Sequence, residues 1–237
     1  MAARFWVGGT GTWDATTTTN WSATSGGASG ASVPGAADDV TIDSSFTVTT
    51  NYNVSVNLVT INAATATLSL GGTLTCTGAI TLTQGTFTTN NYAVSATVLS
   101  SNNSNTRAIN LGSSAVTLSA STPIIFSTNT GLTFNAGTST ITCSAIDATI
   151  TGGAASATGV TFYNVSLTAT AAITHNIQSI NTFNNLTVTG PAAANVTQVT
   201  FDSRQTISGT LSTTGTAGNR RVWFRGLTYG LAQTLTI

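Results

Sequence analysis

The alternation of apolar and polar residues from residue 46 onward is the feature that most limits how this chain can fold. Successive short segments repeat it, among them FTVTTN (46–51), NVSVNLVTIN (53–62), ATLSLGG (66–72) and TLTCTG (73–78). A period of two is typical of β-strands that place one face on a core. Gly and Asn residues, which tolerate left-handed backbone conformations, interrupt the pattern at short intervals, and no stretch has a helical period. The sequence therefore predicts an all-β protein of many short strands.

An internal repeat indicates how these strands are arranged. Residues 161–168 (TFYNVSLT) recur 21 positions later as TFNNLTVT. Three short strands and three turns, which make one coil of a parallel β-helix, need about this length of chain. Stacked coils would place Phe162 over Phe183 and Asn164 over Asn185, and such ladders of identical side chains suit stacked sheets. We therefore expect a parallel β-helix (β-solenoid), with a β-sandwich or jelly roll as the alternative.

The N-terminal region concentrates large aromatic side chains, and it holds three of the four tryptophans: Trp6, Trp13 and Trp21. The end of a solenoid exposes unpaired backbone groups, which bulky side chains can cover. We expect residues 1–45 to form a Trp-rich N-terminal cap, or a docking segment in which the tryptophans anchor a partner. The solenoid body would then occupy residues 46–237. The body stops inside the alternating run QTLTI, so we expect it either to continue beyond this chain or to pair its last strand with another subunit.

The charge of the chain is small and balanced, with six Arg, six Asp and a formal net charge of zero. A neutral chain offers no electrostatic attraction for nucleic acid or an anionic lipid surface. No apolar run approaches the roughly 20 residues of a membrane-spanning helix. The sequence MAARFWVGG at the N-terminus lacks the apolar segment of a secretory signal. We therefore expect neither nucleic acid nor membrane as a partner.

Cysteine and aspartate positions give little support for a metal site. Cys76 and Cys143 lie alone in alternating segments without a C-x-x-C partner, which favours two buried free thiols over a disulfide. Four carboxylates lie near the N-terminus, at Asp14, Asp38, Asp39 and Asp43. Oxygen ligands of this kind suit Ca²⁺, but residues at the entry of strands serve equally well in turns, which is the interpretation we favour. We predict no metal and no cofactor.

Few residues of the chain are equipped for catalysis. Glycoside hydrolysis needs two carboxyl groups at a set separation, and Asp147 and Asp202 are 55 positions apart, which is not a multiple of the repeat. His175 is the single histidine, has no carboxylate nearby in the sequence, and is predicted to be a turn or surface side chain. We therefore predict no catalytic residues and no enzymatic activity.

The segment NRRVWFRG (219–226) is the densest cluster of large and charged side chains in the chain. In a strand, one face would carry three of them, Arg221, Trp223 and Arg225. This face would contact a neighbouring subunit or a glycan, or would form a local cation–π cluster.

Several segments resemble structural proteins of tailed bacteriophages. The N-terminal signature WVGGTGTWD, NWS and SVPGAADDVTID is similar to that group, as are GLTFNAGTSTITCS, FNNLTV and GTAGNRRVWFRG further along the chain. The resemblance implies a β-helical body and a place on the virion surface, as a capsid decoration protein, head fibre, or tail fibre or spike component. It implies phage capsid or tail proteins as partners, assembly into a homo-oligomer, a trimer, and contact with host surface glycans.

Two other functions stay open at the level of sequence. A bacterial cell-surface adhesin would share the β-helical body but would need a secretion route. A glycan-degrading β-helical tailspike would need a pair of carboxyl groups in a groove.

Overall fold

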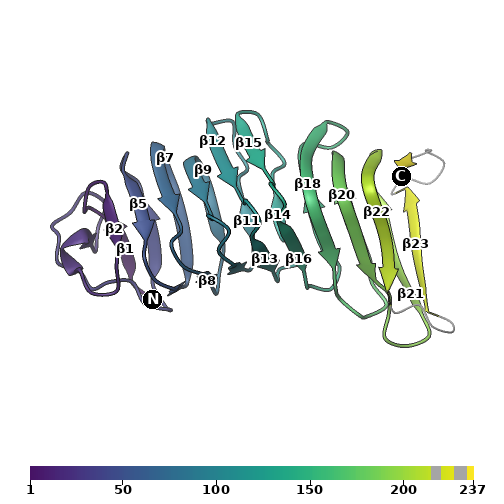
Figure 1. The fold of residues 1–237 in the computed structure, drawn as a ribbon, viewed down its shortest axis with the longest axis horizontal. Coiled ribbons are helices and arrows are strands. Elements are labelled where there is room, and N and C mark those ends of the chain that lie inside the picture. The colour runs from purple at the N-terminus through teal and green to yellow at the C-terminus, as the bar shows by residue number, and fades with distance from the viewer. Residues whose placement is uncertain (215–219, 227–233) are drawn as a thin grey trace.

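The structure is a computed structural model that describes residues 1–214, 220–226 and 234–237. The chain winds into a rod of stacked coils that runs from the N-terminal end to the C-terminal end (Figure 1). Within these residues every strand pair is parallel except β1 (Ala3–Trp6) with β3 (Trp21–Ser22). The predicted parallel β-solenoid is therefore confirmed, and the sandwich alternative is wrong because its sheets would be antiparallel. Part of the GTAGNRRVWFRG segment, residues 215–219, and the first residue of QTLTI lie outside the described residues.

The strands of successive coils lie on one another in three faces. Face 1 begins each coil, and its strands stack in register along the whole described rod. These strands are β1, β4 (Asp39–Ile42), β7 (Leu58–Ser69), β9 (Ile80–Thr88), β11 (Leu99–Ser100), β14 (Ile124–Ile125), β17 (Thr149–Thr151), β19 (Thr174–Gln178), β21 (Val196–Phe201) and β23 (Arg221–Gly226).

Face 2 continues from face 1 around a corner, because the long strands β7 and β9 pass from one face to the other. They join both faces into one sheet, which has 15 strands in the part of the chain that the structure describes. The remaining separate strands of face 2 are β2 (Gly11–Trp13), β5 (Thr47–Thr50), β12 (Arg107–Asn110) and β15 (Leu132–Asn135). The 3-10 turn η1 (Thr18–Asn20) lies between β2 and β3.

Within the described residues, face 3 is a nine-stranded parallel sheet that closes the coils from β6 onward. Its later strands are long because they begin beside face 2, where Phe162 of β18 packs against Phe134 of β15. The strands are β6 (Val54–Val56), β8 (Leu74–Cys76), β10 (Val94–Ala96), β13 (Ala115–Leu118), β16 (Thr140–Cys143), β18 (Thr158–Leu167), β20 (Ile180–Thr189), β22 (Gln205–Thr214) and β24 (Leu235–Thr236).

Of every two successive residues in a strand, the period-two pattern places the apolar one in the interior. β18 and β20 pair in the register that the 21-residue repeat predicts, with Phe162 beside Phe183 and Asn164 beside Asn185. The two phenyl rings stack with centroids 5.3 Å apart and an interplanar angle of 15°. Along face 2 the inward side chains form one apolar column: Val48, Leu68, Phe87, Ile109, Phe134, Phe162, Phe183 and Ile207. Burial of these columns is the main source of stability.

The coils differ in length although the strands keep their register. Val59 pairs with Ile80, 21 residues further along the chain, whereas Ile150 pairs with Ile177, 27 residues further along. The additional residues lie in corners, such as the bends at 152–157 between β17 and β18. Coil length is therefore set by the corners and not by the stacked strands.

The N-terminal region is continuous with the solenoid. β1 pairs in parallel with β4, and β2 pairs in parallel with β5, so the first coil already forms part of faces 1 and 2. Residue 45, where the sequence suggests a boundary between cap and body, falls between β4 and β5 of a single coil. Residues 1–45 are thus joined to the following coil by strand pairing on faces 1 and 2.

Candidate binding surfaces

The three N-terminal tryptophans close the first end of the rod. Trp6, Trp13 and Trp21 are each 0% exposed. Trp21 lies between the other two, at ring-centroid distances of 5.1 Å from Trp6 and 4.9 Å from Trp13, both in edge-to-face geometry. Trp6 Nε1 donates a hydrogen bond to Gly9 O at 2.6 Å, which holds one ring in place. Buried in this way, the rings present no surface to a partner.

Two of the N-terminal carboxylates, Asp14 and Asp38, serve as acceptors for backbone groups. Asp14 Oδ1 accepts hydrogen bonds from the backbone N–H of Thr16 and Thr17, and these bonds with the Thr17 hydroxyl lower the pKa of Asp14 to about 2. Asp38 accepts from the N–H of Ala2 and Gly35, which lowers its pKa as well. Among the described residues no group of three or more His, Cys, Asp or Glu side chains could hold a metal ion.

His175 and the cysteines belong to the interior. His175 lies in β19 and is 0% exposed, and its Nδ1 accepts a hydrogen bond from the N–H of Ala148 at 3.1 Å. Burial lowers the pKa of His175 to about 4, so the imidazole is neutral at pH 7. The prediction of a surface or turn imidazole is wrong, because His175 alternates in phase with the buried Ile177. Cys76 and Cys143 are buried free thiols, as predicted, and burial raises the pKa of each to about 12.

Asp147 and Asp202 lie at opposite ends of face 1. Asp147 Oδ1 accepts from the N–H of Thr174, at the start of β19, and Asp202 Oδ1 accepts from the N–H of Ser179, just past its end. Five residues of extended chain separate these donors, roughly 16 Å at about 3.3 Å per residue. Paired carboxyl groups of glycosidases lie about 5–10 Å apart, so these two aspartates do not have that geometry.

Arg107, at the start of β12, is a buried cation that sequence reasoning missed. Its guanidinium donates to the backbone carbonyls of Ser101, Asn105, Thr128 and Thr130, and also to the Ser101 hydroxyl. Burial lowers the pKa of Arg107. The side chain thus ties the corner of one coil to the corner of the next. Its alternation in phase with the buried Ile109 is the signal that could have placed it inside.

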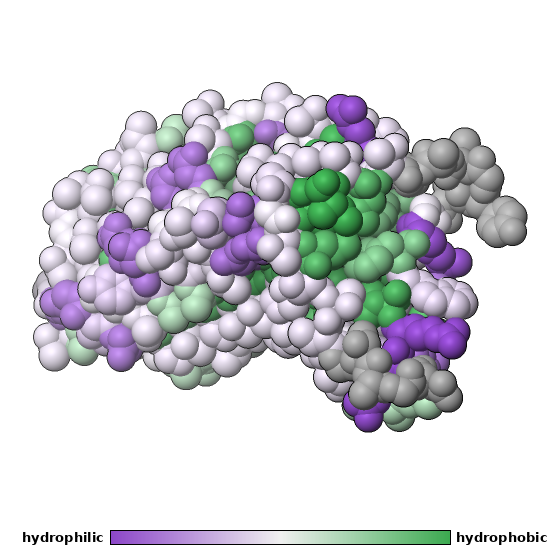
Figure 2. Space-filling model, turned by 45° about the vertical axis from the view of Figure 1, so that its right-hand side comes forward, coloured by the Kyte–Doolittle hydropathy of each residue, from purple (hydrophilic) through white to green (hydrophobic). Residues whose placement is uncertain are grey.

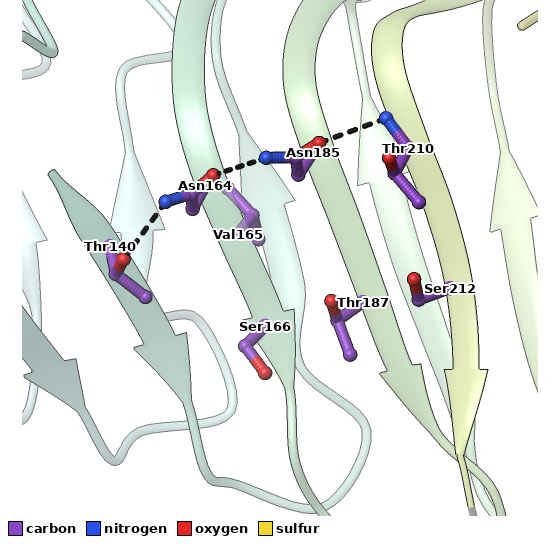
Figure 3. Close-up of a pocket in the computed structure, with 8 residues that line it drawn as sticks. All are labelled: Thr140, Asn164, Val165, Ser166, Asn185, Thr187, Thr210 and Ser212. Carbon is purple, nitrogen blue, oxygen red and sulfur yellow. Dashed lines mark hydrogen bonds between the residues drawn. The ribbon is translucent and has the colours of Figure 1, made fainter. Parts of the chain in front are cut away.

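The outer side of face 3 carries a ladder of polar side chains across four coils (Figure 3). Asn164 Nδ2 donates to Thr140 Oγ1 at 3.1 Å, Asn185 Nδ2 donates to Asn164 Oδ1 at 2.8 Å, and Thr210 N donates to Asn185 Oδ1 at 2.9 Å. Each amide therefore joins its own coil to a neighbour. The predicted column of asparagines is therefore a ladder of hydrogen bonds that connects neighbouring coils.

A shallow groove of about 450 Å³ lies over this ladder. A second column of hydroxyl-bearing side chains lines it beside the amides: Ser166, Thr187 and Ser212 (Figure 3). The groove carries no charge, so it offers hydrogen bonds to neutral groups and no attraction for ions. It can present a flat hydroxyl surface to water or to a polar polymer.

The predicted strand at the C-terminal end is present as β23, and its side chains alternate as expected. Arg221, Trp223 and Arg225 are exposed, whereas Val222 and Phe224 are half-buried and pack against the core. Phe224 stacks on Phe201 at a centroid distance of 6.1 Å. Figure 2 shows hydrophilic groups beside apolar surface at this end of the rod. The outward face of β23 thus exposes an aromatic side chain and two cationic side chains to solvent.

Beside Trp223 the outer surface of face 1 is hollowed by about 380 Å³. Gln198, Thr174 and Asp147 line this hollow from the three preceding coils, together with Asn195. Sequence reasoning found the tryptophan and its arginines but not these partners, because corners of different length separate the coils and hide the alignment.

In comparisons with known proteins, no family model matches the chain, and no curated protein and no solved structure is significantly similar to it. The described residues include no helix with the length and apolar character needed to cross a membrane. The functional argument therefore depends on the residues and their geometry.

Proposed function

We propose that this chain is a non-enzymatic structural protein of a tailed-bacteriophage particle, displayed on the virion surface as a capsid decoration, head fibre, or tail fibre or spike component. The N-terminal signature and the later segments that resemble such proteins support this proposal. The parallel solenoid supports it as well, because it has the β-helical body that the resemblance implies.

The observation that carries the proposal is the combination of a closed end and long uncharged faces. The buried tryptophan cluster seals one end of the stack, which a projecting rod needs if its first strands are not to pair with other sheets. The outer side of face 3 presents hydroxyl and amide groups that are neutral at every physiological pH. A rod of this kind projects from its attachment point and meets its surroundings along its length.

We also propose that the rod is attached through phage capsid or tail proteins and assembles as a homotrimer. The resemblance to phage structural proteins, which implies assembly into a homo-oligomer, supports this arrangement. Mass photometry of the purified protein tests the trimer, which a monomeric mass at micromolar concentration would contradict.

Cryo-electron microscopy of intact particles tests the main proposal. We expect rod-shaped density that accepts the solenoid, on the capsid shell for a decoration protein or on the tail for a fibre component. A particle lacking the gene provides the control, since the density should then disappear. Absence of the chain from purified particles by mass spectrometry would overturn the proposal.

A further inference from the structure

The hollow beside Trp223 combines an aromatic platform with a row of hydrogen-bonding groups. In register, Thr174 pairs with Gln198, and Gln198 pairs with Trp223. Asp147 precedes them, with its Oδ1 bonded to the N–H of Thr174 at 2.8 Å. Three successive coils thus contribute one side chain each to a row, at about 4.8 Å per coil, and Asp147 extends it from the turn before β17.

Trp223 is suited to stacking because it is 51% exposed, in contrast to the three tryptophans of the cap. The face of an indole ring carries partial negative charge, which attracts the C–H groups on the apolar face of a pyranose ring. Arg221 and Arg225 flank the ring on the same outward face of β23. Such a pair of guanidinium groups favours a carboxylate, which each can bind with two parallel hydrogen bonds.

Gln198 supplies a second, independent observation. Its Oε1 is buried and has no hydrogen-bond partner, although the side chain lines the hollow. Buried acceptors are nearly always satisfied in folded proteins, so an unsatisfied one needs an explanation. Because the side chain lines the hollow, rotation of its terminal amide would let a hydroxyl group of a ligand donate to this oxygen.

We infer that the hollow is a binding site for an acidic oligosaccharide. One pyranose ring stacks on Trp223, its carboxylate binds Arg225 or Arg221, and hydroxyl groups of the following units donate to Gln198 Oε1 and to the Asp147 carboxylate. The length of the row suits a short oligosaccharide and not a single sugar. This inference extends the proposed function by naming the ligand class, but binding by the isolated protein does not depend on where the chain sits in a particle.

The test is binding of the purified protein to an array of defined oligosaccharides that contain uronate or sialate units, beside neutral oligosaccharides of the same length. We expect selective binding to acidic members, loss of at least about tenfold in affinity for Trp223→Ala, and a similar loss for Arg225→Gln. Tyr92→Ala is the matched control, because Tyr92 is an exposed aromatic residue far from β23 and its removal should leave binding unchanged.

Tryptophan fluorescence gives a second readout with a bound ligand. Trp223 is the exposed tryptophan of the chain, so we expect the ligand to shift and quench its emission while the emission of the buried three stays constant. Raising the salt concentration should weaken binding, because the arginines are exposed.

Binding that is absent, that is equal for neutral oligosaccharides, or that Trp223→Ala leaves intact would overturn the inference. An acidic protein that competes for Trp223 in place of sugars would overturn it as well. None of these results would alter the place of the chain in the particle, which microscopy tests separately.

Discussion

Up to residue 100, three polar side chains are buried inside the described coils, whereas eleven are buried in the described coils after residue 100. The coils differ in length in the same way. Val40 pairs with Val59, 19 residues further along, whereas Ile150 pairs with Ile177, 27 residues further along. The two halves of the rod therefore enclose different interiors under one strand arrangement.

The comparison shows what a longer coil requires. A corner with additional residues turns backbone groups inward, and buried backbone groups need hydrogen-bond partners. Arg107 supplies them at the longer corners between β11 and β12 and between β14 and β15, where its guanidinium donates to the carbonyls of Asn105, Thr128 and Thr130. Short coils need fewer such partners, so apolar packing and the tryptophan cap suffice for the first half.

The largest effect is expected for the cap. Trp21→Ala should lower the free energy of unfolding by about 3–5 kcal/mol, because it leaves a cavity between Trp6 and Trp13. Trp223→Ala is the matched change in an exposed tryptophan and should cost no more than about 0.5 kcal/mol. Denaturant unfolding followed by circular dichroism compares the two. Equal losses of unfolding free energy would show that the tryptophan cluster stabilises the rod no more than the exposed Trp223 does.

Arg107 tests whether buried polar side chains support the longer coils. Arg107→Met should lower the free energy of unfolding by about 2–4 kcal/mol, because four carbonyl groups in one buried and three part-buried hydrogen bonds lose this donor. Arg225→Met removes an exposed arginine and should change stability by less than about 0.5 kcal/mol. A small loss for Arg107→Met, measured by the same unfolding experiment, would mean that apolar packing alone holds this corner.

His175 makes the second half sensitive to acid. Its pKa is about 4 in the folded chain and near 6.5 in the unfolded chain, so the unfolded chain binds more protons between these values. Stability should therefore fall as the pH drops from about 6.5 to 4 and level off below, by roughly 3 kcal/mol in total. His175→Asn keeps an acceptor near the Ala148 N–H and should remove this part of the pH dependence. Unfolding curves measured at several pH values for both proteins check the prediction, which an unchanged slope in the variant would contradict.

The smallest effect is expected for the amide ladder. Asn185→Ala should lower the free energy of unfolding by about 1 kcal/mol, because it removes hydrogen bonds to Asn164 and Thr210 at a half-buried position. Thr187→Ala, two residues further along the same outward face, should be close to neutral. If both changes are neutral in denaturant unfolding, the ladder does not contribute to holding the coils together.

The stacked strands were predictable from the sequence, and the corners were not. Phe162 and Phe183 reveal their register because the chain between them repeats, and Val222 and Phe224 reveal their face because period two needs only local sequence. His175 and Arg107 lie at inward positions of the same pattern, yet their polarity argues for the surface until the backbone groups around them are known. The row from Asp147 to Trp223 crosses corners of unequal length, so no fixed repeat connects its members.

The dependence of coil length on the corners has a consequence for how such a rod can change over generations. Duplicating the sequence of one coil downstream of the tryptophan cluster would lengthen the rod by about 4.8 Å, and the new rung would present the same hydrogen-bonding edge to both neighbours. The length of the rod would then change in steps of one coil, while the N-terminal end with its tryptophan cluster stays the same.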